Sequence, residues 1–313
     1  MAVDKLFSGF DVTTPTYKEV NGHKITLDVL VPKDLDPGIY PLIVRFHGGF
    51  LISGASLFAE WFQPWLIEYA LLHKAIIVSP DYRLMPEATG LEILEDLSAA
   101  WNWVYNALPA HLGSEIKPDF NKILIEGDSA GGWCAVQSAI SQAGKAKAMI
   151  AAYPPIDLKI PFFTSAYDRS MVGFPMMPSD IILKHKDTLT KDSICTAASP
   201  PDRLDLAFGA IQNGQYVELL GHDPSLFPME RIESASDLPS MFIMHGKDDS
   251  AVPYMSSENF VEKMKKLHPD TKVMYHAVPG CEHGLDAKAN FETPWLKEGL
   301  DFVTPIWLGD NAI

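Results

Sequence analysis

Short apolar runs, each bounded by polar or turn-forming residues, recur along the chain. They lack the alternation of a strand with one wet face, so they predict strands of a parallel sheet that is buried on both faces. Two earlier stretches, 9–20 and 24–31, mix polar and apolar residues and are expected to pair as strands around the turn Asn21-Gly22. The apolar runs are PLIVRF (41–46), AIIVS (75–79), KILIEG (122–127), AMIAAY (148–153), SMFIMHG (240–246) and KVMYHAV (272–278).

Helical patterns separate several of these runs. Residues 92–107 place apolar groups along one stripe of a helix, and 130–142 and 256–267 are also expected to be helical. Alternating strands and helices predict an α/β fold, with a mostly parallel twisted sheet flanked by helices and right-handed crossovers. With 313 residues and a hydrophobic fraction of 47%, we expect one domain spanning 1–313.

One long interval, 154–238, interrupts the rhythm of strands and helices. It shows no clear strand, and a structureless loop of that length is uncommon in a compact domain. We therefore expect a small helical subdomain that sits over the sheet. The aromatic and methionine side chains of the interval either line an adaptable apolar pocket or form the core of the subdomain itself.

The stretch IEGDSAGGW (125–133) places a serine among glycines between a predicted strand and a predicted helix. The pattern is Gly127-x-Ser129-x-Gly131, which is typical of a sharp turn that exposes a nucleophilic hydroxyl at the carboxyl edge of a sheet. The free N–H groups at the start of the helix favour negative charge on a reacting oxygen. A glycine-rich turn with a capping serine is the alternative, and we favour the nucleophile.

A second signal follows the first apolar run, where the chain reads His47-Gly48-Gly49-Phe50. A glycine pair after a strand can present backbone N–H groups to a carbonyl oxygen that becomes negative during acyl transfer. Gly48, Gly49 and the residue after the serine, Ala130, are therefore candidate donors of an oxyanion hole. His47 is expected to make structural hydrogen bonds instead of acting as a base.

A serine hydroxyl needs a base to remove its proton, and the base needs an acid to orient it. Of the 10 histidines, His283 follows the predicted strand 272–278 in a glycine-bracketed loop, so it lies at the same edge of the sheet. Asp249 follows the preceding strand, which gives the chain order serine, acid, histidine expected for this architecture. Asp248 and Asp157 stay open as alternatives for the acid.

The net charge and the number of cysteines limit which partners and which cellular location we expect. The 25 Lys and Arg residues against 40 Asp and Glu give a net charge of −15, which argues against binding to nucleic acid or to an anionic membrane surface. No apolar run approaches the roughly 18 residues of a membrane helix, and no secretory signal is visible. The 3 cysteines lack metal-binding spacing, so we expect no metal, no cofactor and a cytoplasmic protein.

Taken together, these motifs resemble the α/β-hydrolase fold, specifically its hormone-sensitive-lipase-like esterase family. The matching blocks occur in order and span most of the chain. One departure stands out, because the third glycine of the family's HGGG motif is Phe50 here. The blocks are HGGF (47–50), DYRLMPE (81–87), GDSAGG (127–132), HGKDDSAVP (245–253) and CEHGL (281–285).

The resemblance implies roles for particular residues. It makes Ser129 the nucleophile, His283 the base and Asp249 the acid, and it places Gly48, Gly49 and Ala130 in the oxyanion hole. It makes the interval 154–238 a cap, to which the N-terminal residues Leu6, Phe7 and Phe10 could contribute. Within DYRLMPE it implies structural anchors, namely Asp81, Arg83 and Glu87.

The expected function is hydrolysis of small to medium carboxylic esters through an acyl-enzyme, with a small-molecule ester as partner. Phe50, Asp128 and Trp133 are the candidate pocket residues, and the ring of Phe50 is expected to narrow the acyl pocket. Trp61 and Trp65 are expected to pack under the cap. Alternatives are a thioesterase, an acyltransferase or a hydrolase of fungal secondary metabolism, an arylformamidase, and a disfavoured non-enzymatic receptor. Family members often form homodimers, which this chain could share.

Overall fold

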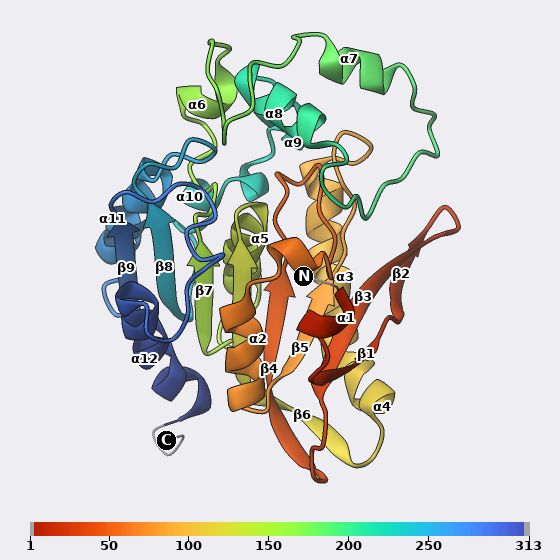
Figure 1. The fold of residues 1–313 in the computed structure, drawn as a ribbon, viewed down its shortest axis with the longest axis vertical. Helices are drawn as coiled ribbons and strands as arrows, with labels where there is room; N and C mark the ends of the chain where they lie inside the picture. The colour runs from red at the N-terminus through yellow and green to blue at the C-terminus, as the bar shows by residue number, and fades with distance from the viewer. Residues whose placement is uncertain (1–2, 310–313) are drawn as a thin grey trace.

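The computed structural model describes residues 3–309 and shows a 9-stranded sheet with helices on both faces (Figure 1). The strand order is β1-β3-β5-β4-β6-β7-β8-β9, and β2 pairs with β3 off this path. The pairs from β5 to β9 are parallel, whereas β1, β2 and β5 run antiparallel to β3. This confirms the predicted fold class. The strands are β1 (Phe10–Thr13), β2 (Thr16–Val20), β3 (His23–Pro32), β4 (Gly38–Phe46), β5 (Ile76–Pro80), β6 (Ile116–Asp128), β7 (Ala148–Ala152), β8 (Ser240–Gly246) and β9 (Val273–Val278).

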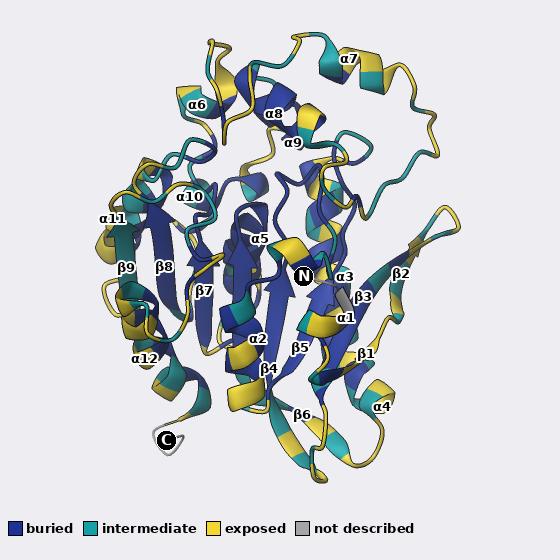
Figure 2. Ribbon diagram, viewed as in Figure 1, coloured by how far each residue is buried: buried dark blue, intermediate teal, exposed yellow. Residues whose placement is uncertain are grey.

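The central strands are apolar without alternation because each face of the sheet meets its own core (Figure 2). Within β4, Leu42 and Val44 point into the core that also holds α3, α5 and α11, whereas Ile43 points into the core formed with α2 and α12. Both side-chain directions are thus buried, as a covered parallel sheet requires. These helices are α2 (Pro64–Leu72), α3 (Gly90–Asn106), α5 (Ala130–Ser141), α11 (Met255–Leu267) and α12 (Pro294–Leu308).

The early mixed stretches form the antiparallel edge of the sheet. β2 and β3 pair as a hairpin through Asn21 and Gly22, which have φ values of 49° and 80°, the positive angles that a tight hairpin turn needs. The stretch 9–20, expected as one strand, is instead divided into β1 and β2. Pro15 lies at the break, where its missing N–H cannot continue the pairing.

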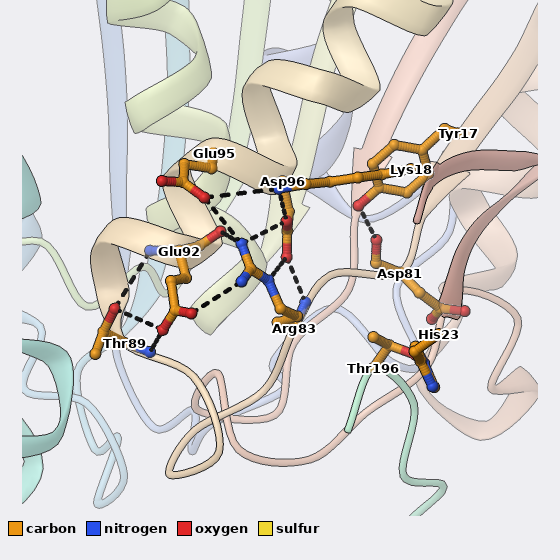
Figure 3. A network of polar contacts seen from close by, with 10 residues as sticks. All are labelled: Tyr17, Lys18, His23, Asp81, Arg83, Thr89, Glu92, Glu95, Asp96 and Thr196. Carbon is orange, nitrogen blue, oxygen red and sulfur yellow. Dashed lines mark hydrogen bonds and ion pairs between the residues drawn. The ribbon is translucent and has the colours of Figure 1, made fainter. Parts of the chain in front are cut away.

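A polar network fastens this hairpin to α3 (Figure 3). The Nε atom of Arg83 donates to Asp96 Oδ2 at 2.8 Å and its Nη1 donates to Glu92 Oε1 at 2.9 Å. From β2, Lys18 Nζ donates to the same Asp96 at 2.6 Å, and the hydroxyl of Tyr17 donates to a backbone oxygen after β5 at 2.7 Å. These contacts therefore support the anchoring role that the family resemblance implies for Arg83.

Between β7 and β8 the described residues 154–238 form short helices and loops, with no named strand among them. In Figure 1, α6 to α9 lie over the end of the sheet at which the parallel strands finish. Arg203 ties this segment to the rest of the domain, because its Nη1 and Nη2 atoms donate to both carboxylate oxygens of Glu87 at 2.8 and 2.6 Å. The helices are α6 (Pro161–Thr164), α7 (Ile181–Lys186), α8 (Leu204–Gln212), α9 (Tyr216–Leu220) and α10 (Pro228–Arg231).

The N-terminal aromatic residues pack away from residues 154–238. Phe7 and Phe10 are buried in the core formed with α2 and α12, and the ring of Phe7 meets Phe62 edge-on at 5.1 Å. This position does not match the expectation that they extend the cap. Among residues 3–309, none of the helices has both the length and the apolar character that crossing a lipid bilayer demands.

Candidate active site

Ser129 stands at the sharp turn between β6 and α5, as the glycine-rich stretch predicted. Its φ of 52° and ψ of −122° are strained for a non-glycine residue, and its N–H donates to the Ala152 carbonyl at 2.9 Å, which helps to hold the turn. A Cβ atom on Gly131 would lie 2.0 Å from the carbonyl oxygen of Phe46. The turn can therefore pack against β4 only with glycine at this position.

The structure brings together the three side chains that the sequence predicted. The Nε2 atom of His283 lies 3.0 Å from Ser129 Oγ, and its Nδ1 atom lies 2.7 Å from Asp249 Oδ2. The Asp249 side chain is 0% exposed and that of His283 is 15% exposed. With Nδ1 protonated toward the carboxylate, Nε2 is the acceptor that faces the serine hydroxyl.

Backbone N–H groups decide which of two neighbouring acids meets the histidine. Asp249 Oδ1 accepts from the N–H groups of Ala251 and Val252 at 2.8 and 2.7 Å, which turns the other oxygen toward the imidazole. Asp248 is exposed, and Asp157 accepts from Asn259 at 3.1 Å instead. Of the three candidate acids, only Asp249 contacts the histidine in the described chain.

The ion pair sets the charge of both groups. Burial by itself would raise the pKa of Asp249, but the charge of His283 and hydrogen bonds from His245 and His283 lower it below its usual value. Burial would likewise lower the pKa of His283, yet the charges of Asp249, Asp128 and Glu282 and the hydrogen bond that His283 donates to Asp249 together raise that pKa. The carboxylate is thus kept ionised and the imidazole is kept basic.

The loop after β4 brings backbone N–H groups to the serine. In the described part of the chain, the N–H groups of Gly48, Gly49 and Ala130 donate to no protein acceptor. Gly49 has a φ of 115°, and a Cβ atom there would lie 2.2 Å from the Ser53 carbonyl oxygen, so the tight curl of the loop depends on glycine. These three N–H groups are the expected oxyanion donors, and the chain leaves them available.

His47 supports this loop from behind. It is buried and stacked on the ring of Tyr82 with centroids 4.4 Å apart, and its Nδ1 lies 2.8 Å from the Gly48 carbonyl oxygen. Burial lowers the pKa of His47 to about 3. A neutral imidazole that is held in this way makes structural contacts, as the sequence analysis expected.

A cavity of about 440 Å³ opens beside Ser129 and His283. Its walls are mostly aromatic and aliphatic, and several come from residues 154–238. Phe50 lines it, with its ring 6.3 Å from that of His283 and 5.6 Å from that of Phe208. The lining residues are Gly49, Phe50, Glu60, Trp61, Phe62, Gln63, Pro64, Asp128, Ser129, Tyr153, Val172, Phe174, Leu204, Phe208, His283, Gly284 and Ala287.

Two tryptophans do not lie where the sequence predicted them. Trp133 was expected in the pocket, but it is fully buried beneath the site and its Nε1 donates to the Leu226 carbonyl at 3.0 Å. The helix turns that side chain away from the cavity, so the pocket assignment is wrong. Trp61 and Trp65 were both expected to pack. Trp65 does so and donates to Asp286 at 3.1 Å, whereas Trp61 lines the cavity.

A buried cluster of charged side chains lies under the cavity, and this cluster was not predicted from the sequence. Arg45 Nη2 donates to Asp128 Oδ1 at 3.0 Å, and Arg45 Nε lies 3.8 Å from Glu126. Asp286 accepts from the hydroxyl of Tyr153, whose ring packs edge-on against His283 at 4.5 Å. Burial raises the pKa of Asp286 to about 6 and raises those of Glu126 and Asp128. Charged residues inside apolar runs, such as PLIVRF and KILIEG, were the available signal.

No group of His, Cys, Asp and Glu side chains among residues 3–309 is arranged to hold a metal ion. The three cysteines Cys134, Cys195 and Cys281 are free.

Fold and site together define a hydrolase-type α/β architecture with a serine, a histidine and an aspartate at the strand ends. A family model described as alpha/beta hydrolase fold matches residues 43–287. The chain therefore belongs to the α/β-hydrolase family, and the resemblance to its hormone-sensitive-lipase-like esterases is confirmed.

Individual proteins and solved structures are similar to this chain. The chain is 33% identical over 313 residues to probable carboxylesterase M8 of Phoma sp., a match that covers 96% of this chain and 98% of that protein. It is 26% identical over 330 residues to the non-reducing polyketide synthase Preu6 of Preussia isomera, covering 94% of this chain and 15% of the synthase. The solved structure of the thermophilic esterase Est2 from Thermogutta terrifontis with butyrate bound matches with a TM-score of 0.61 and 21% identity. That match covers 98% of this chain and 96% of that chain and shows the shared fold.

Proposed function

We propose that the protein is a carboxylesterase that cleaves small to medium acyl esters through a serine-bound acyl intermediate. The observation that carries the proposal is the hydrogen-bonded path from Ser129 Oγ to His283 and on to Asp249, with steps of 3.0 and 2.7 Å. The name of the Phoma relative, probable carboxylesterase, supports the same reaction, because the match covers almost the whole of both chains.

The geometry supports a two-step acyl transfer. His283 Nε2 takes the proton of Ser129 as Oγ bonds to the ester carbonyl carbon, and the carbonyl oxygen becomes an oxyanion. In the proposal, the N–H groups of Gly48, Gly49 and Ala130 bind that charge. When the oxyanion collapses, the bond to the alcohol oxygen breaks and the imidazolium gives its proton to that oxygen. Water then repeats the sequence on the acyl-enzyme, while Asp249 stabilises the imidazolium.

The cavity supports the proposed range of acyl groups. Its volume of about 440 Å³ and its aromatic walls favour short to medium apolar chains. Val172, Phe174, Leu204 and Phe208 come from the interval 154–238 and line the cavity, which supports a cap role for that segment. The ring of Phe50 stands where the family's third glycine leaves open space, and in the proposal it limits the acyl pocket.

The test is the loss of activity in Ser129→Ala with p-nitrophenyl butyrate as substrate. We expect kcat to fall by at least about 10³-fold, because the nucleophile is removed. A fluorophosphonate probe is expected to label the wild type and not the variant. Ser141→Ala, at the far end of the helix that follows Ser129 and away from the cavity, is the matched control and is expected to keep full activity. Activity and labelling that persist in Ser129→Ala would refute the proposal.

A second candidate function is favoured by the similarity to part of a polyketide synthase. In that case the same residues would cleave a polyketide-derived acyl group from a thioester. Ethyl butyrate and S-ethyl thiobutyrate share the acyl group and differ in the leaving atom, so their kcat/KM values compare the two functions directly. A preference for the thioester above about tenfold, or 1.4 kcal/mol, would favour the second candidate.

Two finer expectations stay predictions. These are the cytoplasmic location and the homodimer, and size-exclusion chromatography with light scattering tests the second. Cleavage of N-formylkynurenine tests the arylformamidase alternative in the same activity screen.

A further inference from the structure

The cavity beside Ser129 combines aromatic walls with carboxyl groups. Asp128 and Glu60 both line it, whereas no Lys or Arg is found among its lining residues in the described chain. Asp128 is buried at the floor, and Glu60 is exposed on the 3-10 turn Ala59–Trp61 between β4 and α2. The imidazole of His283 is therefore the one group on the lining that can become positive.

The guanidinium of Arg45 lies below the cavity and is not among its lining residues. It is 1% exposed and donates to Asp128 at 3.0 Å and to the backbone oxygens of Trp61 and Ser56 at 2.9 and 3.2 Å. Its flat face lies 4.1 Å from the ring centroid of Phe62. Because the side chain is buried among these groups, its guanidinium is closed off from a negative group inside the cavity.

The buried groups beneath the cavity hold no spare positive charge. Glu126 and Asp128 lie 3.8 and 3.0 Å from the guanidinium of Arg45, whereas Asp286 accepts from the indole N–H of Trp65 and the hydroxyl of Tyr153. A buried charge without a partner is costly, and a further carboxylate beside these acids would find none. The carboxylate of a substrate could pair with the imidazolium of His283, but this pairing would keep the base protonated and stop the proposed reaction.

We propose that this cavity selects esters by charge: it accepts acyl groups that end in a neutral or cationic group and excludes those that end in a carboxylate. This inference rests on the proposed esterase function and specifies its substrate class. Trp61, Phe174 and Phe208 line the cavity, and aromatic rings attract a quaternary ammonium group. Glu60 adds a negative charge where the cavity reaches solvent.

Three methyl esters of matched length test the proposal. Methyl 5,5-dimethylhexanoate is neutral, methyl 4-(trimethylammonio)butanoate replaces its tert-butyl group with a cation of the same shape, and monomethyl glutarate places a carboxylate at that position. Hydrolysis is followed by pH-stat titration at pH 7.5. We expect kcat/KM for the monoester to be about 100-fold or more below that of the neutral ester, and the cationic ester to react at least as fast as the neutral one.

The outcomes separate the two proposals. If the wild type cleaves neither p-nitrophenyl butyrate nor any of the three esters, the esterase function itself fails, and if it cleaves p-nitrophenyl butyrate but none of the three, the charge selection is overturned. If the neutral ester is cleaved and the monoester lies within about 30-fold of it, the charge selection is overturned while the esterase function stands. A cationic ester that reacts more slowly than its neutral isostere also overturns the charge selection.

A pair of charge-reversal variants tests the part played by Glu60. Glu60→Lys and Glu68→Lys change the net charge equally, and both residues are exposed, but Glu68 lies on α2 outside the cavity lining. At low ionic strength, Glu60→Lys is expected to raise the monoester kcat/KM relative to the neutral ester by about fivefold, and added salt is expected to reduce this gain. Glu68→Lys is expected to leave the ratio unchanged. Equal shifts in both variants would overturn the role of Glu60.

Discussion

Phe50 combines a strained backbone with a buried ring, and we predict that two substitutions will separate these effects. Its φ of 59° lies in the left-handed region, which costs a non-glycine residue about 1 kcal/mol. Its ring is 6% exposed and lies between the rings of His283 and Phe208, at 6.3 and 5.6 Å. Phe50→Ala removes the ring and keeps the strain, whereas Phe50→Gly removes both.

The expected magnitudes follow from these two features. Truncating a buried phenylalanine to alanine costs about 3–5 kcal/mol, and we expect the lower end because the ring borders an open cavity. Phe50→Ala should therefore lower the free energy of unfolding by about 3 kcal/mol. Phe50→Gly should lower it by only about 2 kcal/mol, since the left-handed backbone no longer carries a Cβ atom.

A second aromatic residue on the same cavity supplies the control. Phe208 is buried in the middle of helix α8, where the backbone is right-handed. There the glycine variant should be less stable than the alanine variant by about 1 kcal/mol, which is the usual helix order. Urea unfolding of the four variants, with m-values compared, measures both differences. We expect the alanine and glycine variants to have opposite orders of stability at the two positions.

The same variants report on the acyl pocket. With the ring of Phe50 removed, the best p-nitrophenyl ester in a series from acetate to decanoate should move to a longer chain. The order of stability tests the backbone argument, and the chain-length optimum tests the pocket argument. If Phe50→Gly is less stable than Phe50→Ala, strain is not what distinguishes this position. An unchanged optimum in both variants would show that the ring does not bound the acyl site.

Three further predictions concern the base, the turn and the cap segment. The kcat/KM of the wild type should fall as the pH drops through a midpoint above 6.5, because a neutral His283 is required and its pKa is raised. Burial lowers this pKa, but the charges of Asp249, Asp128 and Glu282 and the hydrogen bond with Asp249 together outweigh burial. Asp249→Asn should shift the midpoint downward, and a wild-type midpoint below 6.5 would contradict the assignment. Gly131→Ala should destabilise the fold by at least about 3 kcal/mol, because the new Cβ atom would lie 2.0 Å from the carbonyl oxygen of Phe46 in β4. A urea unfolding midpoint equal to that of the wild type would disprove this close contact. Arg203→Lys should lower the free energy of unfolding by about 2 kcal/mol and raise KM, because the bidentate contact with Glu87 is lost. A melting temperature equal to that of the wild type would contradict this anchoring role.

The sheet and the turn at Ser129 were predictable because short-range physics dictates them. A continuous apolar run such as 41–46 is tolerated only where both faces are covered, and β4 occupies that place. Asn21-Gly22 supplies the positive φ values of a hairpin turn. The contact of Gly131 with β4 requires the absence of a side chain, which is visible in the sequence as glycine.

Other features depend on contacts between distant segments and left no local signal. Asp248 and Asp249 are neighbours of the same type, and the N–H groups that orient one of them come from how the next residues turn. Trp133 follows the serine on α5, but the helix directs it toward Leu226 instead of the cavity. The path of 154–238 has no periodicity from which it could be derived, so the wall it gives to the cavity emerged only in three dimensions.

The reacting residues and the cavity wall are held by different parts of the fold, and this difference affects how the substrate range can change. The loops with Ser129, Asp249 and His283 follow β6, β8 and β9, which are paired on the sheet and fixed by backbone contacts. Much of the cavity wall comes instead from the loop before α2 and from residues 154–238, which carry Glu60 and Phe174. Substitutions in the wall can therefore alter which ester enters without moving the reacting atoms, whereas changes at the strand ends should slow every ester alike.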